Sequence, residues 1–339
     1  MRLFYKLVYS LAAVVPTVAL AACSAGHAAV VSPPEQPSIT VEAVPTADEA
    51  GLYVAADQGL FRQQGLNVTI VPTVGGGATL PALNSGQAQL VAGNYVSFVR
   101  FQAARQADLR IIAGGSLMKP GNQVLYVMPG SQYRNVDDLA DHHAAIGVNT
   151  KNDVGQLLIG ALMQAQGNSL DDVTLQAEPD GFSEEISKLK SGQLGAAWLP
   201  EPFGTEAQQQ LGAVPLADLD QGPLSNFPIG CYIGTAKWVR SHPDTVAAFL
   251  RALKRGQEIA DTSRPAVERA MQKHLNVPQI VADTMTVDSY PLDIGIPQMQ
   301  RVANEMYQFR VMPPGFSYQG QPYQMSKMIQ SEPAMINGG

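Results

Sequence analysis

The chain has 339 residues, with 22 Lys and Arg against 29 Asp and Glu, and a formal net charge of −7. This acidic balance disfavours a nucleic-acid partner, since such partners need a basic surface. Two cysteines, Cys23 and Cys231, are too few for a disulfide framework, so packing must stabilise the fold.

The amino terminus has the pattern of a lipoprotein export signal. Two basic residues precede an apolar run at 7–22, and the letters LAA lead into Cys23, which is the form of a lipoprotein processing site. We therefore predict a signal peptide at 1–22, lipid attachment at Cys23 and a flexible tether at 23–37. An ordinary secretory signal beside an incidental cysteine is the alternative. Cleavage removes two positive charges, so the net charge becomes −7 − 2 = −9.

The stretch 38–79 predicts a strand, a loop, a helix, a second strand and a glycine-rich loop, the opening unit of an α/β domain. The first strand ends at Pro45, and Thr46 is the expected N-cap of the helix, with Asp48 and Glu49 in its first turn. The second strand, 66–71, leads into the glycine loop. Both loops leave the carboxyl ends of neighbouring strands, where open α/β sheets bind ligands.

The glycine loop is not a phosphate loop, because no Gly-Lys-Ser or Gly-Lys-Thr follows it. Free backbone N–H groups at Gly76, Gly77 and Ala78, where the next helix begins, can still hold an anionic or polar ligand.

The segment after the first loop carries a recognisable motif. The motif consists of the letters YVA at 53–55, Gly59, Phe61, the letters GL at 65–66 and Val68. This pattern resembles the first unit of the solute-binding proteins of ABC importers in the sulfonate, taurine, nitrate and thiamine-pyrimidine group. The resemblance implies a type II periplasmic-binding-protein fold of two α/β lobes joined by two crossover hinge segments. It also implies a small-molecule ligand between the lobes, an ABC permease and ATPase as partners, and an exported protein.

The remainder of the first lobe continues this resemblance. The letters PALNSGQAQLVAGN at 81–94 match a family segment, although Gln89 stands where the family has Asp. Asn94 and Tyr95 open another helix, and a buried-type strand follows at 109–117. Lys119 begins a crossover to the second lobe.

The second lobe is predicted from alternating strands and helices, and the remainder of the chain is mainly helical. The expected strands are 144–148, 173–177, 194–197 and 213–216, and the expected helices are 154–166, 182–190, 203–210, 244–261, 264–274, 277–285 and 297–309. With the return crossover read at 226–234, lobe 1 comprises 38–120 plus 236–339 and lobe 2 comprises 121–235.

The strongest match in the second lobe is the run 195–203, GAAWLPEPF. The family reads Asp-Ala-apolar-Trp and then Glu-Pro-aromatic here, which implies that Trp198, Glu201 and Phe203 border the cleft; Gly195 replaces the aspartate. Family members also place polar residues at the preceding helix start. The corresponding residues are Asn152, Asp153 and the backbone N–H of Val154.

The ligand class stays open between two chemistries. The resemblance implies a sulfonate, taurine or nitrate, whereas carboxylates on the candidate loops favour a zwitterion or an aminopyrimidine, riboflavin or other aromatic heterocycle. Lys119, Lys151 or Arg100 could offset the acidic charge. The predicted ligand-binding residues are Thr46, Asp48, Glu49, Tyr53, Gly76, Gly77, Ala78, Asn94, Tyr95, Lys119, Asn152, Asp153, Val154, Trp198, Glu201 and Phe203.

Nothing in the sequence indicates catalysis, a cofactor or a metal. Adjacent histidines such as His142 and His143 diverge, and neither an HExxH nor a GxSxG pattern occurs. Enzymes related to this family, the pyrimidine synthases, use a cysteine-rich motif that this chain lacks. We therefore predict a non-enzymatic, lipid-anchored receptor on the outer face of the cell membrane, with a permease-independent sensor as a further alternative.

Overall fold

The computed structural model describes residues 32–313, 316 and 321–329. The predicted signal peptide and the lipid attachment at Cys23 lie outside these residues. Among the residues described, none of the helices combines the length and apolar character that crossing a bilayer requires.

The first sheet has five strands in the order β2-β1-β3-β10-β4. Strands β1, β2 and β3 are parallel, whereas β10 runs antiparallel to both β3 and β4. The strands are β1 Ser38–Ala43, β2 Asn67–Pro72, β3 Leu90–Asn94, β4 Leu109–Leu117 and β10 Pro228–Thr235. In β1 every second residue is buried, which follows from the alternating apolar pattern of its sequence.

Helices cover both faces of the first sheet. Ile39 and Val41 of β1 share one apolar cluster with α1, α10 and α11, while Val91 of β3 and Ile111 of β4 belong to a second cluster that includes α4 and α13. The helices of this lobe are η1 Ala47–Glu49, α1 Ala50–Asp57, α2 Leu60–Gln63, η2 Gly76–Ala78, α3 Leu80–Ser85, α4 Tyr95–Ala103, α9 Ala236–Ser241, α10 Pro243–Thr262, α11 Arg264–Leu275, α12 Gln279–Thr284 and α13 Ile296–Gln308, followed by η5 Met325–Lys327.

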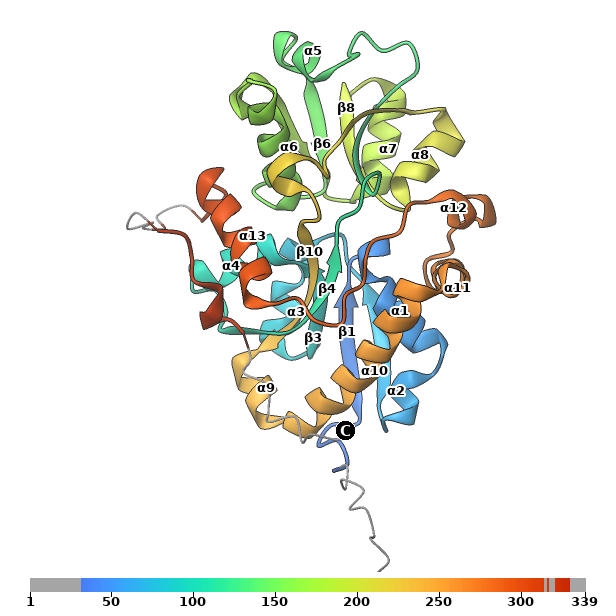
Figure 1. Cartoon of the computed structure of the whole chain (residues 1–339), viewed down its shortest axis with the longest axis vertical. Helices are drawn as coiled ribbons and strands as arrows, with labels where there is room; N and C mark the ends of the chain where they lie inside the picture. Colours follow the sequence, from blue (N-terminus) through green and yellow to red (C-terminus); the bar gives the residue numbers. More distant parts are fainter. Residues whose placement is uncertain (1–31, 314–315, 317–320, 330–339) are drawn as a thin grey trace, which may run out of the picture. The chain divides into compact units, whose positions relative to one another are not determined.

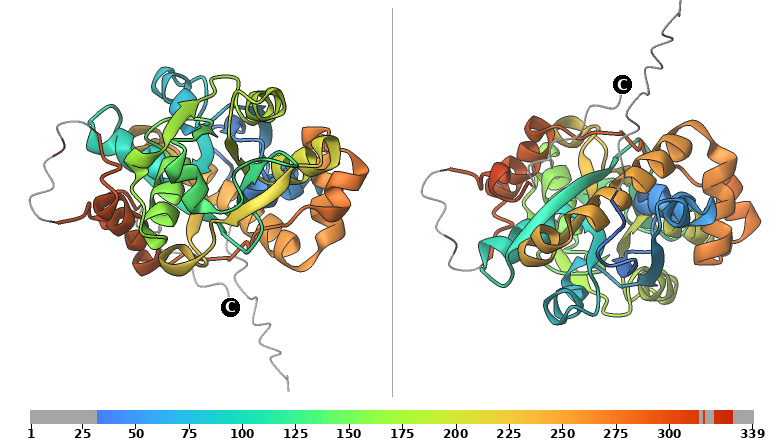
Figure 2. Two further views of the ribbon diagram at one scale, coloured as in Figure 1. Left: turned by 90° about the horizontal axis from the view of Figure 1, so that it is seen from above. Right: turned by 90° about the horizontal axis from the view of Figure 1, so that it is seen from below.

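Helix α10 lies directly against α1 (Figure 2, right). Its buried residues Val246, Phe249 and Leu253 recur at helical spacing and form its sheet-facing stripe. A Cβ at Gly256 would collide with the carbonyl oxygen of Gly51 and lie 2.7 Å from the Cβ of Ala55. Glycine therefore allows the two helices to approach this closely.

The second sheet also has five strands, in the order β7-β6-β8-β5-β9, with β5 antiparallel to its two neighbours. Helices α7 and α8 pack on it, and α12 of the first lobe contacts α8 (Figure 1). The elements are β5 Gln123–Val127, α5 Val136–Asp141, β6 Ala145–Val148, α6 Val154–Ala165, η3 Leu170–Asp172, β7 Thr174–Ala177, α7 Phe182–Ser191, β8 Ala196–Pro200, α8 Phe203–Leu211, β9 Val214–Asp218 and η4 Gly222–Leu224.

Two of the predicted boundaries differ from the structure. The return to the first lobe takes place before Pro228, because residues 228–235 form β10 of the first sheet rather than the end of lobe 2. The predicted tether at 23–37 ends earlier, since the Glu35 carboxylate accepts hydrogen bonds from the backbone N–H groups of Asp244 and Thr245 at 2.9 and 2.8 Å. Glu35 thus caps the start of α10.

Candidate functional site

A small cavity lies where the strand-end loops of the two lobes meet. Its lining residues come from both lobes and comprise Val44, Thr46, Asp48, Glu49, Gly93, Asn94, Ile229, Asn149, Val154, Phe182, Trp198 and Pro200. The centre of a water molecule can occupy about 20 Å³ of this cavity, and one water needs roughly 10–15 Å³ by the same measure. The structure therefore represents a closed form of the cleft.

The loop after β1 brings Thr46, Asp48 and Glu49 to the cavity. The backbone of Thr46 is extended, as expected for an N-cap, but its side chain caps no N–H group. Its hydroxyl instead donates a hydrogen bond to Asp48 Oδ2 at 3.2 Å, and Asp48 Oδ1 accepts another from Gln123 Nε2 at 3.2 Å. Because Gln123 begins β5, this second bond joins the two lobes.

The amino ends of α4 and α6 are bridged across the cleft. Asn94 caps α4 by accepting from the Ser97 N–H, and the Ser97 hydroxyl lies 2.7 Å from both carboxylate oxygens of Asp153. Asp153 also accepts from its neighbour, the N–H of Val154, at 2.8 Å. This N–H, predicted to hold a ligand, already has a partner, because Asp153 caps its own helix.

Aromatic side chains form the second-lobe wall of the cavity. Trp198 lies at the cavity and donates from Nε1 to Gln123 Oε1 at 3.1 Å. Phe182 meets Trp198 edge to face at 5.6 Å between ring centroids. Phe203 packs behind Phe182 at 5.0 Å and lies outside the cavity lining.

Glu201 contacts the first lobe through its backbone. The N–H of Ala47 donates to the carbonyl oxygen of Glu201 at 2.8 Å. The Glu201 side chain turns away from the cavity lining and accepts from the hydroxyl and N–H of Thr205 at 2.8 and 3.2 Å. Burial raises the pKa of this carboxyl to about 7 despite these hydrogen bonds.

A further carboxyl, Asp288, lies beside Asp48. Burial raises the pKa of both groups, and the adjacent Asp48 charge raises that of Asp288 further, well above its usual value. Burial and the charge of Asp48 likewise raise the pKa of Glu49. Burial and the neighbouring negative charges therefore favour the protonated forms of these carboxyls when no cation accompanies them.

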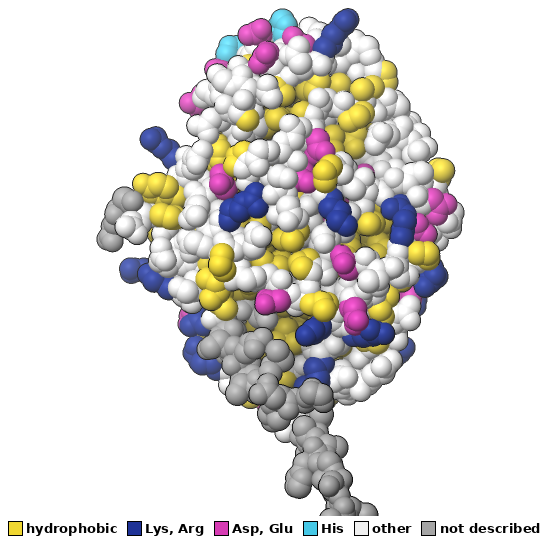
Figure 3. Space-filling model, in the orientation of Figure 1, with side chains coloured by type: hydrophobic (Ala, Val, Ile, Leu, Met, Phe, Trp, Pro, Cys, Tyr) yellow, Lys and Arg dark blue, Asp and Glu magenta, His cyan; other side chains and the backbone are white. Residues whose placement is uncertain are grey.

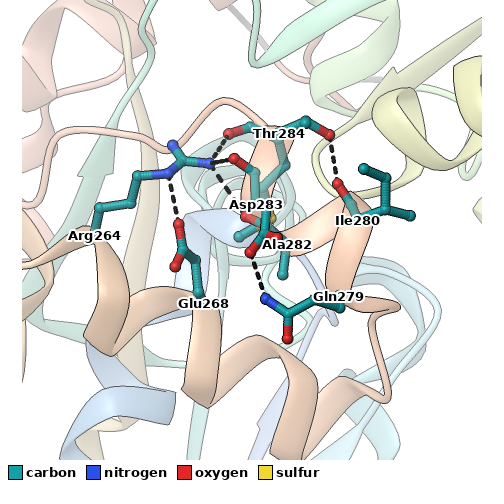
Figure 4. Close-up of polar contacts among 8 residues, drawn as sticks. Arg264, Glu268, Gln279, Ile280, Ala282, Asp283 and Thr284 are labelled. Atoms are coloured by element: carbon teal, nitrogen blue, oxygen red, sulfur yellow. Dashed lines mark hydrogen bonds and ion pairs between the residues drawn. The ribbon is translucent and has the colours of Figure 1, made fainter.

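The segment carrying Asp288 is fixed at both ends. On one side, Arg264 of α11 binds the carbonyl oxygens of Ala282, Asp283 and Met285 at the end of α12, and its Nε contacts Glu268 (Figure 4). On the other side, Ser289 forms two backbone hydrogen bonds with Leu117 of β4, and the Asp261 carboxylate accepts from the Tyr290 N–H. Asp288 is thereby held in place by long-range contacts.

Several predicted site residues lie away from the cavity. Tyr53 and Tyr95 are core residues, with 2% and 1% of their surface exposed, and Gly77 and Ala78 are exposed. Gly76 is buried, and a Cβ there would collide with Ser97, so glycine permits close packing at this point. Lys119 and Asn152 are also exposed, although the Asn152 carbonyl accepts from Arg100 at 2.5 Å.

Four polar or aromatic residues that sequence reasoning did not select, namely Gln123, Asn149, Phe182 and Asp288, also belong to this region. Asn149 follows β6 and Phe182 follows β7, so their places after strand ends could have indicated them. Asn149 Nδ2 also donates to the Val74 carbonyl across the cleft at 3.1 Å. Gln123 and Asp288 carry no comparable local signal, because long-range packing brings them here.

On the face that Figure 3 presents, basic and acidic side chains are interspersed over most of the surface, and acidic ones gather beside the histidines at the top. Within the part of the chain that the structure describes, no group of three or more His, Cys, Asp or Glu is arranged to hold a metal ion.

Two α/β lobes whose strand-end loops enclose a cavity define the periplasmic-binding-protein fold, a fold also found in a solved Candida albicans protein. Residues 46–264 match the family model described as NMT1/THI5 like. The chain therefore belongs to the NMT1/THI5-like family. A comparison with curated proteins found no match.

Solved structures with this fold include binding proteins and an enzyme. The alkanesulfonate-binding protein SsuA from Xanthomonas axonopodis pv. citri, bound to MOPS, is 20% identical, with a TM-score of 0.69 over 82% of this chain and 95% of that chain. The nitrate-binding protein NrtA from Synechocystis PCC 6803 is 15% identical, with a TM-score of 0.70 over 84% of both chains. The desulfurization enzyme DSZB is 16% identical, with a TM-score of 0.63 over 88% of this chain and 97% of that chain. At these identities the likeness establishes the fold alone.

Proposed function

We propose that this protein is the solute-binding component of an ABC importer, which captures a small polar organic solute between its lobes and delivers it to a permease and its ATPase. The observation that carries this proposal is the cavity built from strand-end loops of both lobes. Proteins with the same fold include an alkanesulfonate-binding protein and a nitrate-binding protein.

Closure supplies the signal that a permease can recognise. Direct hydrogen bonds already join the lobes at Ser97 with Asp153, Gln123 with Asp48, and Ala47 with Glu201. At roughly 1 kcal/mol each, such bonds supply part of the closing free energy. Moving a clamp from mostly open to mostly closed takes about 5.5 kcal/mol of differential affinity, so a solute that touches both lobes contributes the remainder.

The family resemblance favours a sulfonate, taurine or nitrate as the solute. The alternative, an aminopyrimidine or another aromatic heterocycle, is favoured by a specific observation: Asp48, Glu49 and Trp198 all line the cavity. Carboxylates accept hydrogen bonds from amines, and the indole offers an apolar ring face.

Solute-dependent closure tests the capture function. Protein beginning at Ser24 is labelled with a fluorophore pair at cysteines replacing Lys190 and Lys254, which are exposed on the second and first lobes, while Cys231 is buried. Taurine, alkanesulfonates, nitrate, an aminopyrimidine and riboflavin are then screened for energy transfer and melting temperature. We expect at least one of these solutes to raise both the energy-transfer efficiency and the melting temperature. No response to any small polar solute would contradict the proposal.

We also propose export and lipid anchoring at Cys23, on the strength of the apolar run and small residues that precede it. Cys23→Ser should abolish labelling by a fatty-acid analogue, and persistent labelling would refute the anchor. A sensor without a permease partner would close around solute equally well. Uptake of the bound solute by cells carrying the neighbouring permease genes distinguishes the importer, and turnover of the solute would instead indicate an enzyme.

A further inference from the structure

Three buried or partly buried carboxyl groups cluster in the first lobe near the cavity. Asp48 and Glu49 line the cavity, whereas Asp288 lies beside Asp48 and outside the lining. Glu49 lines the cavity with only 1% of its surface exposed, and its Oε2 atom has no hydrogen-bond partner. Asp288 is also 1% exposed, and neither of its carboxyl oxygens has a conventional donor. Asp48 precedes Glu49 in the chain, and its charge acts on both Glu49 and Asp288. Unpartnered acceptors in a closed cleft are costly unless a ligand or a proton satisfies them.

The surroundings provide little positive charge. The positive charge of Lys119 acts to lower the pKa of Asp288, but the Lys119 side chain is exposed to solvent. The remaining titratable groups that act on these carboxyls or feel their charge carry no positive charge: Tyr53 of α1, Tyr95 of α4, Cys231 and Tyr232 of β10, and Tyr290 of the segment after α12. Among the described residues that line the cavity there is no Lys, Arg or His.

Protons are the available compensation when the cleft closes without a cation. Burial and mutual repulsion raise the pKa of Glu49 and of Asp288 well above the usual values. A positively charged group placed among these carboxyls would favour their ionised forms. Its binding would therefore release protons, and its affinity would rise with pH. The affinity of a simple anion would instead fall as pH rises, because the ionised carboxylates would repel it.

We propose that Asp48, Glu49 and Asp288 form a subsite for a positively charged amine or amidinium group of the solute, with the rings of Trp198 and Phe182 covering its apolar part. This assignment rests on the proposed function and names the chemical class of the solute. The two aromatic residues stand on the opposite lobe from the carboxyls, so a solute carrying a charged end and a ring contacts both lobes at once. Contact with both lobes is what favours closure.

An organic cation fits this cluster better than a metal ion. No described group of three or more His, Cys, Asp or Glu has an arrangement suited to a metal. A planar amidinium instead offers several N–H donors in a fixed fork, which suits acceptors on different side chains. The adjacent Trp198 and Phe182 rings can stack on the attached group.

The test compares ring compounds of equal size and different charge. Benzamidine is cationic and benzamide is its neutral analogue, while methanesulfonate and nitrate represent anions. Titration calorimetry between about pH 6 and pH 8.5, in two buffers of different ionisation enthalpy, measures affinity and proton release. We expect benzamidine to bind about tenfold or more tightly than benzamide. We also expect it to bind more tightly as pH rises and to release protons.

Substitutions assign the effect to the subsite. Glu49→Gln and Asp288→Asn should each lower benzamidine affinity about tenfold or more and leave benzamide binding unchanged. Glu185→Gln is the matched control, because Glu185 is equally buried and unpartnered but lies in α7 of the second lobe, where the charges that act on it are those of Glu178 and Glu184. Measurement of two neutralised positions keeps the test decisive if one variant folds poorly.

The outcomes separate this inference from the proposed function. Equal binding of benzamidine and benzamide, an effect of Glu185→Gln as large as that of Glu49→Gln, or no binding of benzamidine overturns the subsite. Lobe closure by nitrate or methanesulfonate alone also overturns it, yet leaves solute capture standing. Absence of closure with every solute, in the fluorescence assay described above, removes both.

Discussion

Replacing Ala47 with proline should hold the lobes apart while leaving each of them folded. The Ala47 N–H donates to the Glu201 carbonyl at 2.8 Å, and proline has no N–H group. Ala47 is the first residue of η1, and the preceding Thr46 has φ −120 and ψ 166. Both backbone positions suit a proline and the residue before it. The first lobe should therefore tolerate Ala47→Pro.

The size of the effect follows from the geometry. The proline Cδ lies about 1.5 Å from its nitrogen, in the direction that the hydrogen occupied. With the acceptor at 2.8 Å, Cδ would lie within roughly 2 Å of the Glu201 oxygen, whereas carbon contacts are comfortable near about 3.5 Å. The closed form thus loses a hydrogen bond of about 1 kcal/mol and also acquires a clash.

Fluorescence transfer between labels at positions 190 and 254 measures the result. We expect a longer inter-lobe distance in Ala47→Pro than in Ala47→Gly, the control that keeps the N–H group, together with weaker solute binding. Circular dichroism and melting temperature check that both variants fold. If Ala47→Pro gave the same distance and affinity as Ala47→Gly, the assignment of this bond as an inter-lobe closing contact would be refuted.

Four other changes have expected outcomes. Glu201→Gln should gain stability relative to the native chain as pH rises. The raised pKa of about 7 means that native Glu201 stabilises the fold fully below pH 4.5 and loses that contribution as pH rises through 7. At 1.36 kcal/mol per pKa unit, urea unfolding should show a relative gain of roughly 2.5 kcal/mol between about pH 5 and pH 8.5, and a pH-independent difference would contradict the shift. Ser97→Ala removes a buried bond to Asp153 and should weaken solute affinity about tenfold by calorimetry; unchanged affinity would rule out that closing role. Gly256→Ala should lower unfolding free energy by about 1–3 kcal/mol through overpacking, whereas a gain would show that α1 can move aside. Glu35→Ala should cost about 1 kcal/mol as a lost helix cap, and an unchanged melting temperature would argue against that cap.

Local patterns were sufficient to predict most elements. The apolar spacing of 244–261 predicts α10, which spans Pro243–Thr262, and the strands expected at 144–148 and 173–177 appear as β6 and β7. The return crossover was placed too late for a physical reason. Turn-forming residues around 226–234 suggested a connection, but the apolar run within it pairs with β3 and β4 as a buried strand.

The site was predictable where it follows strand ends or matches the family motif. Thr46, Asp48, Glu49 and Asn94 were selected from loops and helix starts after strands, Trp198 was implied by the motif at 195–203, and all five line the cavity. Their contact with a ligand stays a prediction.

Other parts of the site depend on packing between distant segments. Asp288 was not selected because its neighbours carry no motif, and contacts to Leu117 and Asp261 fix its position. Tyr53 belongs to the family motif and Tyr95 begins a helix, which made both of them candidates for the site. Their rings instead pack in the hydrophobic core.

The contact of Glu35 with the start of α10 determines where a membrane tether would join the folded protein. Glu35 precedes β1, whose opposite end leads to the cavity, and a six-residue strand spans about 20 Å. In the lipid-anchored form we propose, the tether from Cys23 to Glu35 has 35 − 23 = 12 residues, which can span at most about 40 Å. Because Glu35 is bound to α10 of the first lobe, at the end of β1 remote from the cavity, movement of the second lobe during closure would not displace the attachment point.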